Sequence, residues 1–235
     1  MFLLKRFSVL AVLALSAVSI VAAQSSDRNR EMTVEQSYLQ ESIENTIIRE
    51  TARSDSREQK FIALEYISDA IGRGNTSDDV LNTLEYLCLE GTKSVARQSG
   101  RVINNYPDVR RQAVKQLGAL GTKEAKTILL EMCQFENEPM VLQETIKALG
   151  DIGINENNET ISNITFVVSR FDSLRPDNLV ALATIDTFEK IAKANNGLNS
   201  TDAVRLLMRI SEGSYIRPVQ DRARQLLADL RSYSN

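Results

Sequence analysis

The sequence predicts an all-α fold: an α-solenoid of about four helix pairs and a terminal half-repeat, preceded by a signal peptide. Residues 112–121 match residues 144–153 at an offset of about 32 residues, and degenerate copies of the same apolar pattern lie on either side. No segment shows a convincing alternating strand pattern. The four prolines stand where first helices are expected to begin, at Pro107, Pro139, Pro176 and Pro218. Because a lone helix pair cannot bury its apolar face, this spacing predicts stacked pairs with one shared core.

Residues 1–23 are expected to be a secretory signal peptide. Lys5 and Arg6 form a positive n-region, residues 7–20 are almost entirely apolar, and residues 21–23 supply small side chains for cleavage. A membrane-anchoring helix is the alternative, but the apolar run of about 14 residues is shorter than the roughly 20 that span a bilayer. We therefore expect an exported protein, periplasmic in the first place or secreted, without stable membrane insertion after cleavage. Since no cysteine lies near the cleavage site, we do not expect a lipoprotein.

The polar residues 24–32 are expected to be a disordered linker, and residues 33–235 the helical repeat domain. Thr33 and Gln36 form a capping-box pattern, and apolar residues follow at helical spacing, so an amphipathic helix is expected over residues 33–52. We expect this helix to cap the N-terminal end of the stack, as residues 216–232 cap the C-terminal end.

The helix pairs follow in order along the chain. Apolar stripes mark the first helices at residues 64–70, 107–121, 138–153, 185–191 and 227–230, and the second helices at residues 80–87, 125–132, 161–171 and 203–210. The first two of these first helices are further apart in the sequence than the others, and the extra residues fall at 92–106. We expect this segment to be an extended or irregular connection between two pairs.

The segment 107–121 (PDVRRQAVKQLGALG) resembles the first helix of a HEAT repeat, particularly the short variety shared with phycobilisome-lyase-type proteins. The resemblance rests on Asp108, Val109, Arg110, Ala113, Leu117, Gly118 and Gly121. Residues 138–153 repeat the pattern more weakly, without the Asp and the Arg. The resemblance implies a HEAT-like repeat fold in an exported bacterial member of this family. It says little about activity, because one fold hosts many functions.

Composition excludes much catalytic chemistry. The chain has no His, which excludes Ser-His-Asp and Cys-His catalysis, HExxH zinc sites and His-ligated iron sites. Its two cysteines are too few for a four-Cys zinc or iron–sulfur site. Among proteins with HEAT-like architecture, deoxyhypusine hydroxylases need His-Glu motifs and DNA glycosylases are basic and intracellular, whereas bilin lyases stay open as an alternative. We expect no catalytic residues, no metal and no cofactor.

Cys88 and Cys133 occupy similar places in two consecutive second helices, and both lie on the apolar stripe. Two interpretations stay open. The pair are either two buried small hydrophobic residues or, since an exported compartment permits oxidation, a disulfide between stacked helices. A disulfide would need their Cα atoms within about 7 Å of one another.

Charge is unevenly distributed along a chain whose formal net charge is −3. Residues 92–115 hold six basic residues and one acid, whereas residues 131–160 hold seven acids and one Lys. One interpretation is a basic surface that binds an acidic segment of a protein partner. Its candidate residues are Lys93, Arg97, Arg101, Tyr106, Arg110, Arg111 and Lys115. The alternative is ordinary solvated helix faces, with Asp108 and an arginine joining neighbouring repeats.

The function that fits these features is a non-enzymatic protein-binding scaffold of the bacterial periplasm or envelope, which presents a curved helical surface to a protein partner. A structural subunit of an envelope machine is one alternative, and a lyase-like or small-ligand-binding HEAT protein is another. Nucleic acid is not expected as a partner, because the net charge is negative.

Overall fold

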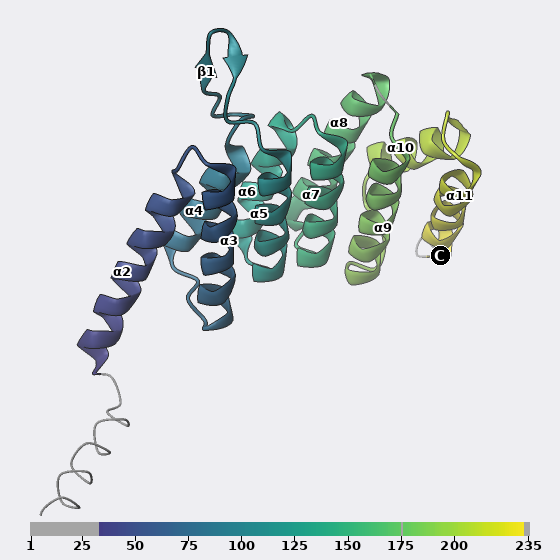
Figure 1. Ribbon diagram of the computed structural model, residues 1–235. Coiled ribbons are helices and arrows are strands. Elements are labelled where there is room, and N and C mark those ends of the chain that lie inside the picture. The colour runs from purple at the N-terminus through teal and green to yellow at the C-terminus, as the bar shows by residue number, and fades with distance from the viewer. Residues whose placement is uncertain (1–32, 175, 233–235) are drawn as a thin grey trace, which may run out of the picture. The chain divides into compact units, whose positions relative to one another are not determined.

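The computed structural model describes residues 33–174 and 176–232, so the predicted signal peptide and linker lie outside the described residues (Figure 1). The chain divides into two compact units, Met1–Glu44 and Asn45–Asn235. The described residues of the first unit form the start of helix α2 (Val34–Ala52), and this helix begins where the capping box predicts. The Gln36 N–H donates to Thr33 Oγ1 at 3.3 Å, and the Thr33 N–H donates to Gln36 Oε1 at 3.1 Å.

The second unit confirms the predicted all-α class. After the last residues of α2 it contains α3 (Arg57–Gly72), α4 (Asp78–Leu89), α5 (Pro107–Leu120), α6 (Lys123–Phe135), α7 (Pro139–Ile152), the 3₁₀ turn η2 (Glu156–Asn158), α8 (Glu159–Leu174), α9 (Asn178–Ala194), α10 (Thr201–Glu212) and α11 (Arg217–Ser232). These are the predicted four pairs and terminal half-repeat. Within the described ranges, none of the helices combines the length and apolar character needed to cross a membrane.

Helices of the second unit pack in two layers, as an α-solenoid requires. The first helices contact one another in sequence order, α3 with α5, then α7, α9 and α11. The second helices α4, α6, α8 and α10 form the other layer, and each packs on the first helix of the next pair (Figure 1). One continuous core lies between the layers, with Leu84, Leu117, Leu129 and Phe188 fully buried. Consecutive pairs therefore bury one another's apolar faces.

Proline placement agrees with the prediction. Pro107 and Pro139 are the first residues of α5 and α7, and Pro218 is the second residue of α11. Pro176 stands just before Asp177, which caps α9 by accepting from two backbone N–H groups. The three positions inside helices suit proline because the first helical turn has no intrahelical partner for its backbone N–H groups, whereas Pro176 lies just outside its helix.

Two glycines in the repeated Leu-Gly pattern allow the first helices to approach closely. A Cβ atom at Gly118 would lie 2.9 Å from the Cβ atom of Ala148 on α7. A Cβ atom at Gly150 would lie 2.7 Å from Thr187 Oγ1 on α9. Close packing therefore requires the glycine that recurs in this pattern, because any side chain at either position would push neighbouring helix pairs apart.

The connection over residues 92–106, predicted to be extended or irregular, contains a short pair of strands that the sequence pattern did not predict. Arg97–Gln98 (β1) pairs antiparallel with Arg101–Val102 (β2), and the pair stands clear of the helix ends (Figure 1). Ser99 and Gly100 form a two-residue turn with φ of 49° and 81°. Positive φ at both central residues is typical of the type I′ turn, whose backbone twist matches the twist of the two strands that it joins. Strands of two residues are too short to show an alternating pattern, so the sequence does not predict them.

Candidate interaction surfaces

Arg110 lies in the protein interior, which corrects the prediction that it contacts a partner. Its side chain is 2% exposed and that of Glu136 is 1% exposed. The guanidinium binds this carboxylate with both ends: Nε donates to Oε2 at 2.7 Å and Nη2 to Oε1 at 3.2 Å. Nη1 donates to Asn105 Oδ1 at 2.7 Å and to the Glu90 carbonyl at 3.3 Å. Arg110 therefore joins the second pair to the segments on both sides of it.

A second buried ion pair repeats this arrangement one pair earlier. Lys60 is fully buried, and its Nζ lies 2.8 Å from Glu90 Oε2 and donates to the Ala52 carbonyl at 2.9 Å. The hydroxyl of Tyr86 donates to Glu90 Oε1 at 3.2 Å. Burial and the neighbouring Glu90 carboxylate raise the pKa of Tyr86 to about 12. The phenol therefore stays protonated and keeps donating to Glu90.

The role of these buried charges was not predicted, although the sequence contains a signal for it. Lys60 and Arg110 are each the fourth residue of a first helix, and Glu90 and Glu136 each directly follow a second helix. Lys60 also shares the apolar stripe of its helix, since Leu64 stands one turn further on. A basic residue on an apolar stripe, with an acid at a repeated position, indicates a buried ion pair.

The remaining cations of the basic stretch divide into paired and unpaired residues. Lys93 pairs with Glu131, and Arg111 Nε donates to Glu144 Oε2 at 2.9 Å. Both acids belong to the acidic stretch 131–160, so these two ion pairs join the basic stretch to the acidic one. The aromatic candidate Tyr106 is half-buried.

Two further contacts join the second helix pair to the first. The Tyr106 hydroxyl donates to the Asp55 carbonyl at 2.9 Å. Arg57 Nε donates to Asp108 Oδ2 at 2.8 Å, as the solvated-face alternative requires. Burial alone would raise the pKa of the Asp108 carboxyl, but the hydrogen bonds from Arg57 and the Val109 N–H hold that pKa below its ordinary value.

Arg97, Arg101 and Lys115 are exposed and have no acidic partner among the described residues. Arg97 and Arg101 lie on the two strands of the segment 94–104, hereafter the hairpin. Because paired residues share a face, Arg97 lies beside Val102, and Arg101 lies beside Gln98 on the opposite face. Exposed apolar side chains accompany them: Val95, Val102 and Ile103. The structure thus brings two of the seven predicted residues together on one exposed element.

Both cysteines are buried free thiols in this structure. Cys88 and Cys133 lie in the core of the second-helix layer, as the buried-hydrophobe interpretation expects. Burial raises the pKa of the Cys88 thiol well above its ordinary value and that of Cys133 to about 12. Since the thiolate is the reactive form, neither side chain is suited to redox chemistry.

We expect both thiols to resist a water-soluble disulfide reagent at mildly alkaline pH while the protein is folded. Both should react after unfolding in guanidinium without reductant, because unfolding restores exposure and the ordinary thiol pKa. The measurement is the number of thiols modified, by mass spectrometry. Reaction in the folded protein would contradict the burial of these residues, and no reaction after unfolding would indicate a disulfide.

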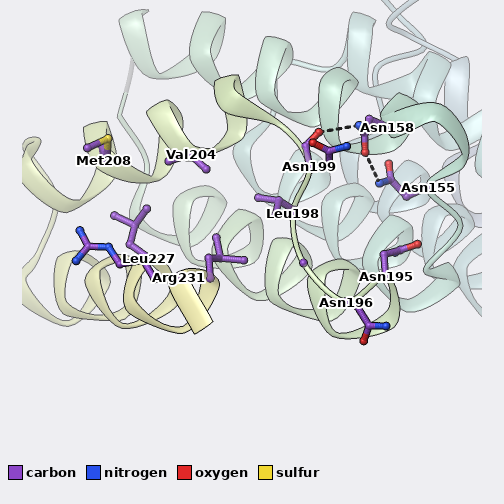
Figure 2. A pocket seen from close by; sticks show the side chains of 12 residues that line it. Asn155, Asn158, Asn195, Asn196, Leu198, Asn199, Val204, Met208, Leu227 and Arg231 are labelled. Atoms are coloured by element: carbon purple, nitrogen blue, oxygen red, sulfur yellow. Dashed lines mark hydrogen bonds between the residues drawn. The ribbon is translucent and has the colours of Figure 1, made fainter. Parts of the chain in front are cut away.

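A hollow of about 500 Å³ lies beside α10, α11 and two inter-helix connections (Figure 2). It is lined by Asn155, Asn158, Asn195, Asn196, Gly197, Leu198, Asn199, Val204, Met208, Leu227, Leu230 and Arg231. Figure 2 shows the amides on one side and Met208 with Leu227 on the other. Asn155 Nδ2 donates to Asn158 Oδ1 at 3.2 Å, and Asn158 Nδ2 donates to the Asn199 carbonyl at 2.7 Å. These amides therefore join the two connections to one another.

The chemistry available in this hollow is narrow. Among its lining residues Arg231 is the only titratable side chain. Asn158 and Asn196 have φ of 61° and 52°, a conformation that Asn adopts more readily than most residues. The turn conformation therefore explains why asparagine occupies these two positions. In the described part of the chain, no group of three or more Cys, Asp or Glu side chains could hold a metal ion.

Comparison with known protein families supports the repeat assignment for part of the chain. Residues 102–165 match the family model of HEAT repeats. The match runs from strand β2 through α5, α6 and α7 into α8. No curated protein and no solved structure gives a significant match to this chain.

Proposed function

We propose that this protein is a non-enzymatic protein-binding scaffold and that the hairpin is part of its contact surface. The observation that carries the proposal is the pair Arg97 and Arg101, exposed and without acidic partners among the described residues. Lys93, Arg110 and Arg111 pair with acids, so apart from Lys115 on α5 the hairpin holds the unpaired positive charge of residues 92–115. An acidic segment of the partner protein would complement it, and apolar side chains of that segment would cover Val102 and Ile103.

Two further observations support a binding role. HEAT repeats commonly mediate contacts between proteins, and the family match begins in β2 of the hairpin. The base of the hairpin is tied down, since Asn104 Nδ2 donates to the Ser94 carbonyl at 2.8 Å and Asn104 Oδ1 accepts from the Ala96 N–H at 2.9 Å. A pre-ordered element loses less conformational entropy on binding.

The setting of this function is also a proposal. The n-region, apolar run and small residues of positions 1–23 support export, with the periplasm or envelope as the working compartment. The first helices α5 and α7 are both 14 residues long, and their similarity to the short HEAT pattern supports that variety of repeat.

The test is site-specific photocrosslinking in the cells that produce the protein, with a photoreactive residue at position 103 of the tagged full-length chain. We expect one discrete adduct with a partner protein. The double substitution Arg97→Glu/Arg101→Glu should reduce that adduct at least about tenfold, because reversing both charges repels an acidic segment. Mass spectrometry of the adduct identifies the partner and the segment captured.

A matched control separates the hairpin from general charge effects. Arg217→Glu/Arg231→Glu makes the same change of charge at two exposed positions of α11. Its adduct yield should equal that of the unsubstituted protein. Equal yields from both double variants, or no adduct at all, would refute the proposal. Urea unfolding should show that both variants keep their stability.

A further inference from the structure

The described residues of the first unit, 33–44, form a helical segment that the proposed function does not use, hereafter the α2 segment. None of its residues is buried. It contains three acids and no basic residue. Four of its large apolar side chains are 53% to 72% exposed: Val34, Tyr38, Leu39 and Ile43. Because most helical stability in proteins comes from packing an apolar face, the α2 segment lacks its usual source of stability.

One ridge of the α2 segment combines charge with apolar character. Glu35, Leu39 and Ile43 are spaced four residues apart, so they share one face of the helix. Ile48 and Ala52, the buried apolar residues of α2, lie on another face. The packing of α2 therefore leaves this ridge uncovered.

The hairpin offers the complementary arrangement. Arg97 and Val102 are paired across the two strands, so their Cβ atoms lie about 5 Å apart on one face. On α2, four residues separate Glu35 from Leu39, which corresponds to a rise of about 6 Å. The two surfaces therefore place one charge and one apolar side chain at nearly the same spacing, with charges of opposite sign. Arg101, on the opposite face of the hairpin, adds to the attraction towards the acids.

Charge decides which surface can cover the α2 segment. A second α2 segment would bring acids against acids, and an anionic lipid surface would repel them in the same way. The hairpin instead carries arginines without acidic partners among the described residues, next to the exposed apolar side chains of Val102 and Ile103. The hairpin requires an acidic segment with apolar side chains as its partner, and the α2 segment meets that requirement.

We propose that the hairpin of one copy of this protein binds the α2 segment of another copy. The Arg97 guanidinium pairs with the Glu35 carboxylate, and Val102 packs on Leu39 and Ile43. Because the contact joins two different surfaces, a pair of copies still has one hairpin and one α2 segment for further copies, so assembly continues into an open filament or closes into a ring. The inference rests on the proposed function, since it takes the hairpin to be the contact surface and identifies its partner.

Sedimentation velocity of the purified protein, in the form that its cells accumulate, tests this inference. We expect the average mass to increase with protein concentration. It should decrease as salt is added, because the Debye length shortens from about 10 Å at 0.1 M to about 3 Å at 1 M. Arg97→Glu/Arg101→Glu reverses the charge of the hairpin, and Leu39→Gln/Ile43→Gln removes the apolar side chains of the ridge while keeping good helix formers. Each double substitution should weaken self-association at least about tenfold.

Mixing the two variants shows which surfaces meet. Each variant retains the surface that the other has lost, so an equimolar mixture should form a 1:1 complex and nothing larger. Dimers of the hairpin variant alone would mean that α2 segments pair with one another, and a mixture that stays monomeric would mean that the hairpin and the α2 segment do not meet. Either result overturns the inference, as does an unsubstituted protein that stays monomeric at every concentration.

Two matched controls complete the design. Arg217→Glu/Arg231→Glu makes the same change of charge on α11. Met140→Gln/Leu179→Gln removes two apolar side chains that are 56% and 54% exposed on α7 and α9. Both variants should self-associate like the unsubstituted protein, because neither changes the hairpin or the α2 segment.

The photocrosslinked adduct at position 103 separates this inference from the proposed function. An adduct with residues 33–44 of a second copy supports both. An adduct with another protein alone, lost in the hairpin variant, supports the proposed function and overturns this inference.

Discussion

Replacing Arg110 with alanine is expected to lower the free energy of unfolding by about 3–5 kcal/mol. The substitution leaves the Glu136 carboxylate, 1% exposed, without the guanidinium that binds it. An unpaired buried charge loses its hydration without compensation, which is why breaking such a pair costs more than the pair itself contributes. Urea unfolding followed by far-UV circular dichroism measures the change.

Two variants show whether burial is the cause. Arg111→Ala breaks the next ion pair along the helix, whose arginine side chain is 40% exposed, and should cost no more than about 1 kcal/mol. Arg110→Met/Glu136→Gln removes both charges together and should recover most of the lost stability, since the amide oxygen can still accept from the Asn137 and Glu138 N–H groups. A loss in Arg110→Ala no larger than in Arg111→Ala would contradict the buried position. A charge reversal at Arg110 would disturb the fold, so it cannot test a binding surface.

Leu117→Asp is expected to unfold the protein or to cost about 4 kcal/mol or more. Leu117 is fully buried on α5, in the core that the stacked pairs share. Its replacement puts a carboxylate among apolar side chains that offer it no hydrogen bond. Because each pair relies on its neighbours for burial, the damage should spread along the stack rather than stay local.

Ala119→Asp provides the matched control for this prediction. Ala119 lies two residues further along α5, and its side chain is exposed. The same carboxylate there should cost less than about 1 kcal/mol, mostly through helix propensity. Equal thermal unfolding curves for the two variants would mean that the two faces of α5 are assigned the wrong way round.

The fold was predictable because its determinants are local in the sequence. Helical periodicity identified the pairs, and the prolines marked where first helices begin. Gly118 and Gly150 recur because a side chain there would clash with the next helix. The hairpin escaped prediction for a local reason as well, since two paired residues per strand carry no measurable alternation.

The candidate surfaces were predictable only in part, because exposure and pairing depend on residues distant in the sequence. Counting charges identified a basic and an acidic stretch, but not that Arg111 bonds Glu144 in the following pair. Nor could a count separate Arg110, bonded in the interior, from Arg97 and Arg101 on the hairpin. Periodicity and helix-end signals are properties of neighbouring residues, so the chain displays its architecture directly. Which charges remain available for a partner depends on the packing of one helix pair against the next.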